Sequence, residues 1–164
     1  MAKKTDETKT ELPIKAAATP AKDYVGAVGR RKEAVARVRL YPKIKEGFMW
    51  QEKEVKKGDI WVNGIAAEHY FAGVNGKMDY MEVLRVTNTT NRFAITVKVA
   101  GGGKKGQLDA MIHGISRALS AFDTDTLRPI LKKKKYLTRD SRIRERRKVG
   151  TGGKARRKKQ SPKR

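Results

Sequence analysis

Residues 93–122 read FAITVKVAGGGKKGQLDAMIHGISRALSAF and decide the fold class. The first seven residues alternate apolar and other side chains and are rich in β-branched types, which predicts a strand. Between residues 107 and 122, apolar side chains recur at intervals of three and four, which predicts a helix with one buried stripe. A strand that leads directly into a long amphipathic helix would supply both kinds of element to one two-layer core. The apolar positions are Phe93, Ile95, Val97 and Val99 in the strand and Leu108, Met111, Ile112, Ile115, Leu119 and Phe122 in the helix.

A second strand is predicted upstream, at residues 34–41 (AVARVRLY), where small and apolar residues occupy one face and two arginines the other. We expect Gly26 and Gly29 to bracket a hairpin turn whose tip presents three more cations beside the strand arginines. Five cations on one hairpin favour contact with an anion, and a solvated charged turn is the alternative. The five are Arg30, Arg31, Lys32, Arg37 and Arg39.

Three short elements are predicted between these strands. Residues 59–65 (DIWVNGI) are typical of a strand that runs into an Asn-Gly turn. Residues 66–71 predict a short helix or turn. Residues 77–86 predict a helix, because apolar side chains recur there at helical spacing. The side chains at that spacing are Met78, Met81 and Leu84.

Two other segments are less regular. Residues 43–58 are charged, and their only apolar island is FMW at residues 48–50, which would either cap the edge of the core or meet a neighbouring molecule. Residues 123–125 break the long helix and offer an N-cap to a last short helix that runs through Leu131.

The chain divides into three parts by composition. Residues 1–22 show no sustained hydrophobic periodicity, and we predict that they form a disordered extension. We predict a globular α/β domain at residues 23–135 and an extended basic tail at residues 136–164. The 37 residues 128–164 hold eighteen Lys or Arg against two acids. Because such a segment cannot bury enough apolar surface to offset the entropy of ordering, it needs a polyanion to fold against.

The formal net charge of +23 points to nucleic acid or an anionic membrane as the main partner. A membrane-binding helix would need bulky apolar residues opposite its charges, whereas the tail beyond Leu137 has only Ile143, Val149 and Ala155. We therefore predict a nucleic-acid partner and no membrane partner. None of the common DNA-reading motifs is present.

Several classes of chemistry are disfavoured by what the sequence lacks. It has no cysteine, which excludes disulfides, thiolate zinc sites and thiol catalysis. His69 and His113 are too few for a metal cluster; His69 is predicted to be a surface or packing residue and His113 a surface residue. No signal peptide or membrane span is apparent. The expectation is an intracellular, soluble protein without a metal or cofactor.

The glycine-rich loop offers one enzymatic alternative. Gly101, Gly103 and Gly106 fit the dinucleotide-binding pattern between a strand and a helix, and Asp123 or Asp125 lies near the distance expected of a ribose-binding acid. That site, however, needs a second parallel strand after the helix, which the sequence does not predict. The P-loop pattern fails too, because its Lys and Ser/Thr positions hold Gln and Leu.

Three interpretations of this loop remain. Glycine backbone, a helix N-terminus and the charges of Lys104 and Lys105 together suit docking of a nucleic-acid phosphate. A plain helix entry is the second interpretation. The third is a small nucleotide-binding enzyme that uses the Gly101–Gly106 loop, and no catalytic constellation supports it.

A succession of short motifs resembles a known family. In order and spacing, residues 24–164 are similar to small-subunit ribosomal protein nine of the bacterial type. Each motif alone is weak, and their succession is specific. The motifs are VGRRK (28–32), AVARVR (34–39), VNG (62–64), GGG (101–103), GQ (106–107), HGISRAL (113–119), LRP (127–129), LTRD (137–140), ERRK (145–148), KARR (154–157) and KR (163–164).

The resemblance implies a sheet covered by helices, with a left-handed β-α-β crossover like that in the second domain of ribosomal protein five. It also implies a non-enzymatic protein of the cytoplasmic ribosome, located in the head of the small subunit. Its partners would be small-subunit rRNA, neighbouring head proteins and, at the tip of the tail, peptidyl-site tRNA. No small-molecule substrate is expected.

The expected site residues follow from the cations and from the resemblance. Those for rRNA are Arg30, Arg31, Lys32, Arg37, Arg39, Lys104, Lys105, Arg117, Arg139, Arg142, Arg146, Arg147, Lys148, Lys154, Arg156 and Arg157. Those for tRNA are Ser161, Lys163 and Arg164. Pro162 departs from the usual family ending, and it stiffens the chain just ahead of the last two residues.

Overall fold

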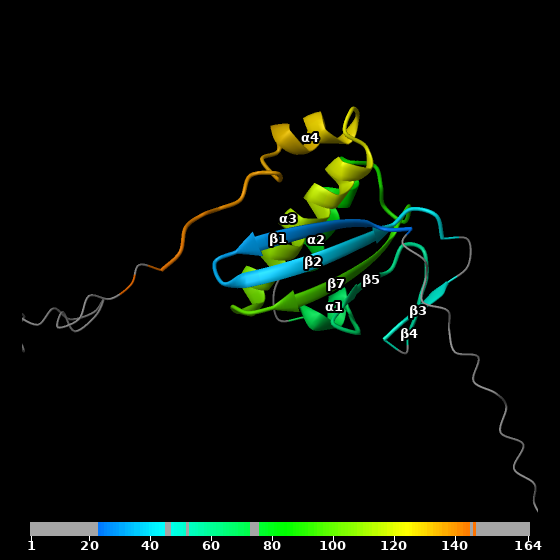
Figure 1. Ribbon diagram of the computed structural model, residues 1–164, viewed down its shortest axis with the longest axis horizontal. Helices are drawn as coiled ribbons and strands as arrows, with labels where there is room; N and C mark the ends of the chain where they lie inside the picture. The colour runs from blue at the N-terminus through cyan, green and yellow to red at the C-terminus, as the bar shows by residue number, and fades with distance from the viewer. Residues whose placement is uncertain (1–22, 45–46, 52, 73–75, 145, 147–164) are drawn as a thin grey trace, which may run out of the picture.

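The computed structural model describes residues 23–44, 47–51, 53–72, 76–144 and 146. It confirms the predicted mixed α/β class: strands β1 and β2 cross in front of helix α3, and α4 lies beyond one end of that helix (Figure 1). The elements are β1 (Val25–Arg31), β2 (Ala34–Tyr41), β3 (Phe48–Trp50), β4 (Lys53–Val55), β5 (Ile60–Val62), β6 (Ile65–Ala66), α1 (Ala67–Tyr70), α2 (Gly76–Val86), β7 (Ala94–Ala100), α3 (Lys104–Phe122) and α4 (Leu127–Lys133).

The predicted β1–β2 hairpin is present, but its turn lies at Lys32 and Glu33. Both strand glycines lie within β1, so the prediction that they bracket the turn is wrong. A Cβ on Gly29 would lie 1.9 Å from the carbonyl oxygen of Ala110 and 2.4 Å from the backbone nitrogen of Gly114, both in α3. Gly29 therefore marks a place where the helix backbone approaches the strand backbone.

The large sheet has the strand order β1-β2-β7-β5-β6. β2 is antiparallel to β1 and β7, whereas β5 is parallel to β7. Parallel neighbours cannot be joined by a tight turn, and the chain between β5 and β7 passes through β6, α1 and α2.

The turn between β5 and β6 is the predicted Asn-Gly turn. Asn63 and Gly64 have φ values of +49° and +79°, as a two-residue hairpin turn requires. The Asn63 side chain also extends the sheet, because its amide donates to the carbonyl of Val99 at 3.0 Å and accepts from the Val99 N–H at 2.9 Å.

The main core lies between the sheet and α3. The predicted inward face of β7 is confirmed, and so is the helix stripe, with Ile112 and Phe122 only partly buried at its margins. Small residues of α3, Ala110, Gly114 and Ala118, are also buried, which allows the close approach at Gly29. The buried stripe residues of α3 are Leu108, Met111, Ile115 and Leu119.

The opposite face of the sheet carries a second, smaller core. Trp50 and Val55 of the β3–β4 pair are buried against Tyr41 and Ala94, with Phe48 and Trp61 packed beside them. Phe48 and Trp50 of the apolar island at residues 48–50 therefore cap the outer side of the sheet, whereas Met49 is 46% exposed.

Helix α2 is present, and its predicted apolar face is only partly correct. Leu84 is buried and Met81 packs partly buried against the core, as expected, whereas Met78 is 77% exposed. Tyr80 and Val83 are also buried. Burial raises the pKa of Tyr80 to about 12. In a short helix, apolar residues spaced three and four apart can lie on two overlapping faces, and periodicity alone does not show which face is buried.

Helices α3 and α4 are joined by the predicted break. α3 begins at Lys104, three residues before the expected start, because extended Gly103 already forms its N-cap. At the break, the Asp123 carboxylate accepts from the N–H of Thr126 at 3.0 Å and from its hydroxyl at 2.5 Å. No helix in the described part of the chain is long and apolar enough to cross a membrane.

The chain after α4, residues 136–144, turns back onto the domain before it departs, and we call this segment the tail root. Tyr136 and Leu137 pack against the main core, and the N–H of Tyr136 donates to the carbonyl of Leu131. The beginning of the predicted tail is thus in contact with the globular part.

Candidate nucleic-acid interface

A group of cations lies on the outer face of the sheet, the face opposite α3. Because side chains alternate along strands, Arg30, Arg37 and Arg39 point away from the buried positions of β1 and β2, and all three are exposed. Lys98 of β7 is directly opposite Arg37 and is also exposed. We call these four residues the outer cationic face.

No carboxylate from these strands balances the outer cationic face. The sequences of β1, β2 and β7 contain neither Asp nor Glu. Like charges directly opposite one another on neighbouring strands destabilise a sheet, so the Arg37–Lys98 pair opposes folding. An anion placed across both strands would relieve this repulsion.

One end of the outer cationic face is bounded by aromatic rings. The Arg39 guanidinium lies 4.8 Å from the ring centroid of Tyr24, which is 37% exposed. Tyr41 stacks between Tyr24 and Phe48 and leads into the β3–β4 core. Tyrosine rings beside arginines provide stacking surface for unpaired bases.

Arg31 is placed differently from its neighbours. It is opposite Ala34 on the inward side of the hairpin, and its side chain is only 14% exposed. Its guanidinium lies 2.9 Å from Asp140 of the tail root and 3.7 Å from Asp109 of α3. Lys32, at the tip of the turn, remains exposed.

The glycine loop is explained by packing. Gly101 and Gly102 have positive φ values of +73° and +62°. A Cβ on Gly101 would lie 2.5 Å from the carbonyl oxygen of Glu33, so the loop closes against the start of β2. A Cβ on Gly103 would meet nothing within 4 Å, and one on Gly106 only ordinary contacts. Packing therefore requires glycine at position 101, whereas positions 103 and 106 have room for a side chain.

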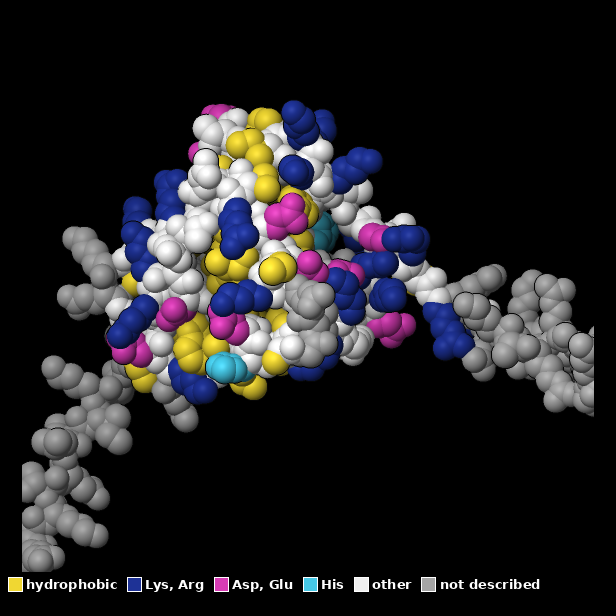
Figure 2. Space-filling model, turned by 180° about the vertical axis from the view of Figure 1, so that it is seen from behind, with side chains coloured by type: hydrophobic (Ala, Val, Ile, Leu, Met, Phe, Trp, Pro, Cys, Tyr) yellow, Lys and Arg dark blue, Asp and Glu magenta, His cyan; other side chains and the backbone are white. Residues whose placement is uncertain are grey.

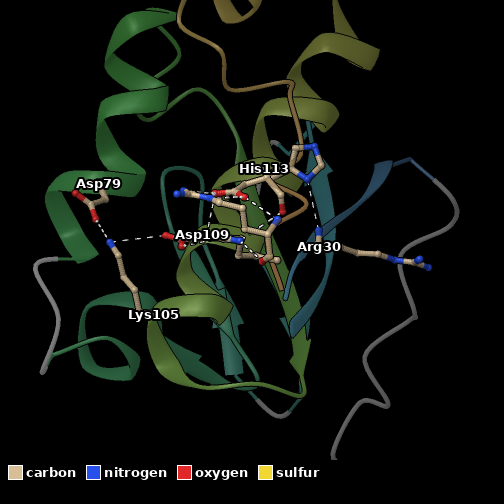
Figure 3. Close-up of polar contacts among 8 residues, drawn as sticks. Arg30, Asp79, Lys105, Asp109 and His113 are labelled. Carbon is tan, nitrogen blue, oxygen red and sulfur yellow. Dashed lines mark hydrogen bonds and ion pairs between the residues drawn. The ribbon is translucent and has the colours of Figure 1, made fainter. Parts of the chain in front are cut away.

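The two lysines after the loop are engaged within the protein. Lys104 lies 3.5 Å from the ring centroid of Tyr70 and donates to its carbonyl oxygen. Lys105 donates to Asp79 at 2.8 Å, which raises its pKa, and lies 3.7 Å from Asp109 (Figure 3). In the described residues α3 is followed by α4 and the tail root, without the parallel strand that a dinucleotide site requires.

Two side chains of α3 cover the open edge of the sheet. Arg117 donates to the carbonyl oxygen of Val28 at 2.5 Å, and His113 accepts from the backbone N–H of Arg30 at 3.4 Å. These contacts satisfy polar groups of the edge strand β1. Figure 3 shows the Arg30 side chain extending away from His113.

An open groove lies between α3, α4 and the tail root. It has a volume of about 360 Å³ and is lined by two arginines, two hydroxyl side chains and two apolar side chains. Arg117 thus combines a contact to the sheet edge with exposure at a cationic groove. The lining residues are Arg117, Ser120, Ala121, Thr124, Arg128 and Leu137.

Three of the expected tail cations lie in the part of the chain that the structure describes. Arg139, Arg142 and Arg146 are exposed in the described part of the tail. From behind, Lys and Arg side chains gather where the chain leaves the body, with acidic side chains among them (Figure 2). The rest lie outside the described residues: Arg147, Lys148, Lys154, Arg156, Arg157, Ser161, Lys163 and Arg164.

Sequence reasoning missed Lys98, Asp109 and Asp140. Lys98 could have been predicted, since the alternation that predicted β7 places it on the outward face of that strand. The two aspartates had none, because their roles depend on Arg31, which is 78 and 109 residues away from them in the chain.

Acidification is expected to destabilise the fold through His113. Burial lowers its pKa below the ordinary 6.5, and the charges of Arg117 and Arg139 lower it further, whereas a hydrogen bond with the backbone of Leu137 opposes the shift. Because the folded-state pKa is depressed, this stability is complete above the ordinary value and is lost as pH falls through the folded-state value. Protonation at Nδ1 would also remove the acceptor for the Arg30 N–H.

The measurement is the thermal midpoint between about pH 7.5 and pH 5. The His113→Gln variant should show a smaller fall than the parent protein, and His69→Gln should retain the parent behaviour. Equal pH dependence in the parent and the His113→Gln protein would contradict this assignment.

Comparisons with known proteins agree on one family. Residues 29–164 match the family described as ribosomal protein S9/S16. Small ribosomal subunit protein uS9 of Anaeromyxobacter sp. (strain K) is 42% identical over 126 residues, which cover 77% of this chain and 86% of that protein. The protein of the same name from Maridesulfovibrio salexigens is 46% identical over 132 residues, which cover 80% and 91%.

Proposed function

The chain belongs to the ribosomal protein S9 family, and from this premise we propose that it is a structural constituent of the small ribosomal subunit that binds rRNA in the cytoplasmic ribosome. The family is structural and not enzymatic. The nucleotide-binding alternative has no supporting observation, because the glycine loop is accounted for by packing against Glu33.

The outer cationic face is the observation that supports RNA binding most directly. Four exposed cations lie on three adjacent strands that carry no acid, and two of them are cross-strand neighbours. Exposed cations on neighbouring strands suit binding to the phosphates of a nucleic-acid backbone, and Tyr24 offers an adjacent ring for stacking. The groove beside Arg117 and the basic tail extend the cationic surface.

Finer expectations come from the family resemblance and are proposed here. The protein occupies the head of the subunit beside other head proteins. The connection between the parallel strands β5 and β7 is a left-handed crossover like that of ribosomal protein five. The tail reaches peptidyl-site tRNA through Ser161, Lys163 and Arg164. The parallel β5–β7 pairing and the nine cations of residues 147–164 support these proposals.

Replacing Arg37 and Lys98 with glutamine is expected to weaken RNA binding while stabilising the free protein. Removing a like-charge cross-strand pair should raise the free energy of unfolding by about 0.2–1 kcal/mol. Loss of two phosphate contacts should reduce the slope of log affinity against log salt by about 1.4–1.8. The measurements are urea unfolding and binding to small-subunit rRNA fragments at several salt concentrations.

The matched control is Lys77→Gln, since Lys77 is an exposed cation of α2 that is paired with Glu68. It should leave the salt slope unchanged. If the Arg37/Lys98 double variant bound RNA with the parent slope, the outer cationic face would not be the RNA-binding surface.

A further inference from the structure

Arg31 makes its contacts with the protein itself. Its Nη2 lies 2.9 Å from the Asp140 carboxylate, and its Nη1 donates to the carbonyl of Arg142 at 2.8 Å and lies 3.5 Å from that of Asp140. Its Nε lies 3.7 Å from the Asp109 carboxylate. All three guanidinium nitrogens therefore face acceptors of α3 or the tail root.

Asp140 is the counterpart of Arg31 in this cluster. Its carboxylate accepts from the backbone N–H of Arg142 at 2.9 Å and from the guanidinium of Arg142, and these bonds hold its pKa well below the usual range. Asp140 therefore stays ionised at any pH at which the protein is expected to work. One carboxylate thus links the hairpin to the turn that begins the departing tail.

The tail root is also held at a second place, nearer its start. Tyr136 and Leu137 pack on the main core, and the backbone N–H of Thr138 donates to the carbonyl of Lys135. Two separated attachments fix both position and direction, whereas one would leave the segment free to pivot. The hydrogen bond from Arg31 to the carbonyl of Arg142 is the other attachment.

We propose that Arg31 is a positioning residue that, with Asp140, clamps the tail root to the β1–β2 hairpin and so sets the direction in which the basic tail leaves the domain. The effect of this clamp on RNA affinity rests on the proposed RNA-binding function. A tail that starts from a fixed origin loses less freedom on binding than one that pivots, so the clamp strengthens RNA binding without contacting RNA.

The neighbouring arginines provide a matched pair for the test. Arg30 and Arg31 carry the same charge at adjacent positions, but Arg30 is exposed on the outer face and Arg31 is not. Arg30→Gln should lower the salt slope of RNA affinity by about 0.7–0.9, the value of one phosphate contact. Arg31→Gln should leave that slope unchanged and weaken affinity by roughly tenfold, because the tail must then be ordered on binding.

The position of the tail root is measured on the full-length protein without RNA. Because the chain has no cysteine, spin labels at Ser141→Cys and Thr90→Cys would be unique, and their distance distribution reports the clamp. We expect a narrow distribution in the parent and in Arg30→Gln, and a broad one in Arg31→Gln and in Asp140→Asn. Asp140→Asn keeps the arginine, so it serves as the second variant if Arg31→Gln fails to fold.

The outcomes separate this inference from the proposed function. A narrow distribution in Asp140→Asn and Arg31→Gln, or a salt slope that falls equally in Arg30→Gln and Arg31→Gln, would overturn the clamp. Absence of RNA binding by the parent protein would overturn the proposed function, and the label distances would still decide whether the clamp exists. Restoration of a narrow distribution in the charge-swapped Arg31→Asp/Asp140→Arg protein would support the pairing directly.

Discussion

Replacing Gly29 with alanine is expected to lower the free energy of unfolding by about 3 kcal/mol, the upper part of the range for overpacking a core. The added Cβ would lie 1.9 Å from the carbonyl oxygen of Ala110 and 2.4 Å from the nitrogen of Gly114. Both are backbone atoms of α3, so no side-chain rotation relieves the clash. The helix would have to move away from β1 and β2, where most of the core is buried.

The control is Gly26→Ala in the same strand. Its Cβ would point to the outer face and lie 3.3 Å from the ring of Tyr24, which can move. Its stability should therefore change by less than about 1 kcal/mol. Urea unfolding of both variants measures the difference, and equal stabilities would show that α3 does not approach β1 as closely as described.

Removing residues 147–164 is expected to have the largest effect on RNA binding. This segment holds nine Lys or Arg and no Asp or Glu. If each cation meets one phosphate of single-stranded RNA, the slope of log affinity against log salt should fall by about 6. Binding to small-subunit rRNA fragments should then keep only the salt dependence that the cations of the domain contribute.

Two further variants serve as a control and as a test of the end of the tail. A full-length variant in which the nine Lys and Arg exchange identities keeps the charge and should keep the parent slope. A shorter truncation, residues 161–164, should leave subunit assembly intact but weaken tRNA binding at the peptidyl site. An unchanged salt slope after removal of residues 147–164 would show that the tail does not bind rRNA. Unchanged tRNA affinity after removal of residues 161–164 would show that the end of the tail does not contact tRNA.

The Gly29 contact and the outer cationic face lie on opposite sides of the sheet, the first on the side that faces α3. Gly29→Ala is therefore expected to change stability without altering the cations that we propose to bind RNA.

The sequence by itself determined the elements whose patterns are local. Alternation placed β2 and β7 and assigned their faces, and the three-four stripe of α3 was correct because a long helix repeats it several times. The Asn-Gly turn followed from the positive φ values that only a few residues adopt readily. The charge of the tail and the order of the motifs pointed to RNA and to the family.

Only the tertiary structure decided what depends on residues that are distant in the chain. Gly29 was expected in a turn because glycine is common there, but it lies in a strand because α3 touches it from 81 residues away. Arg31 was expected to bind RNA with Arg30 and Lys32, yet alternation turns it inward, where Asp109 and Asp140 hold it. Composition records how many charges a chain carries, whereas the packing of its backbone decides which of them are already paired.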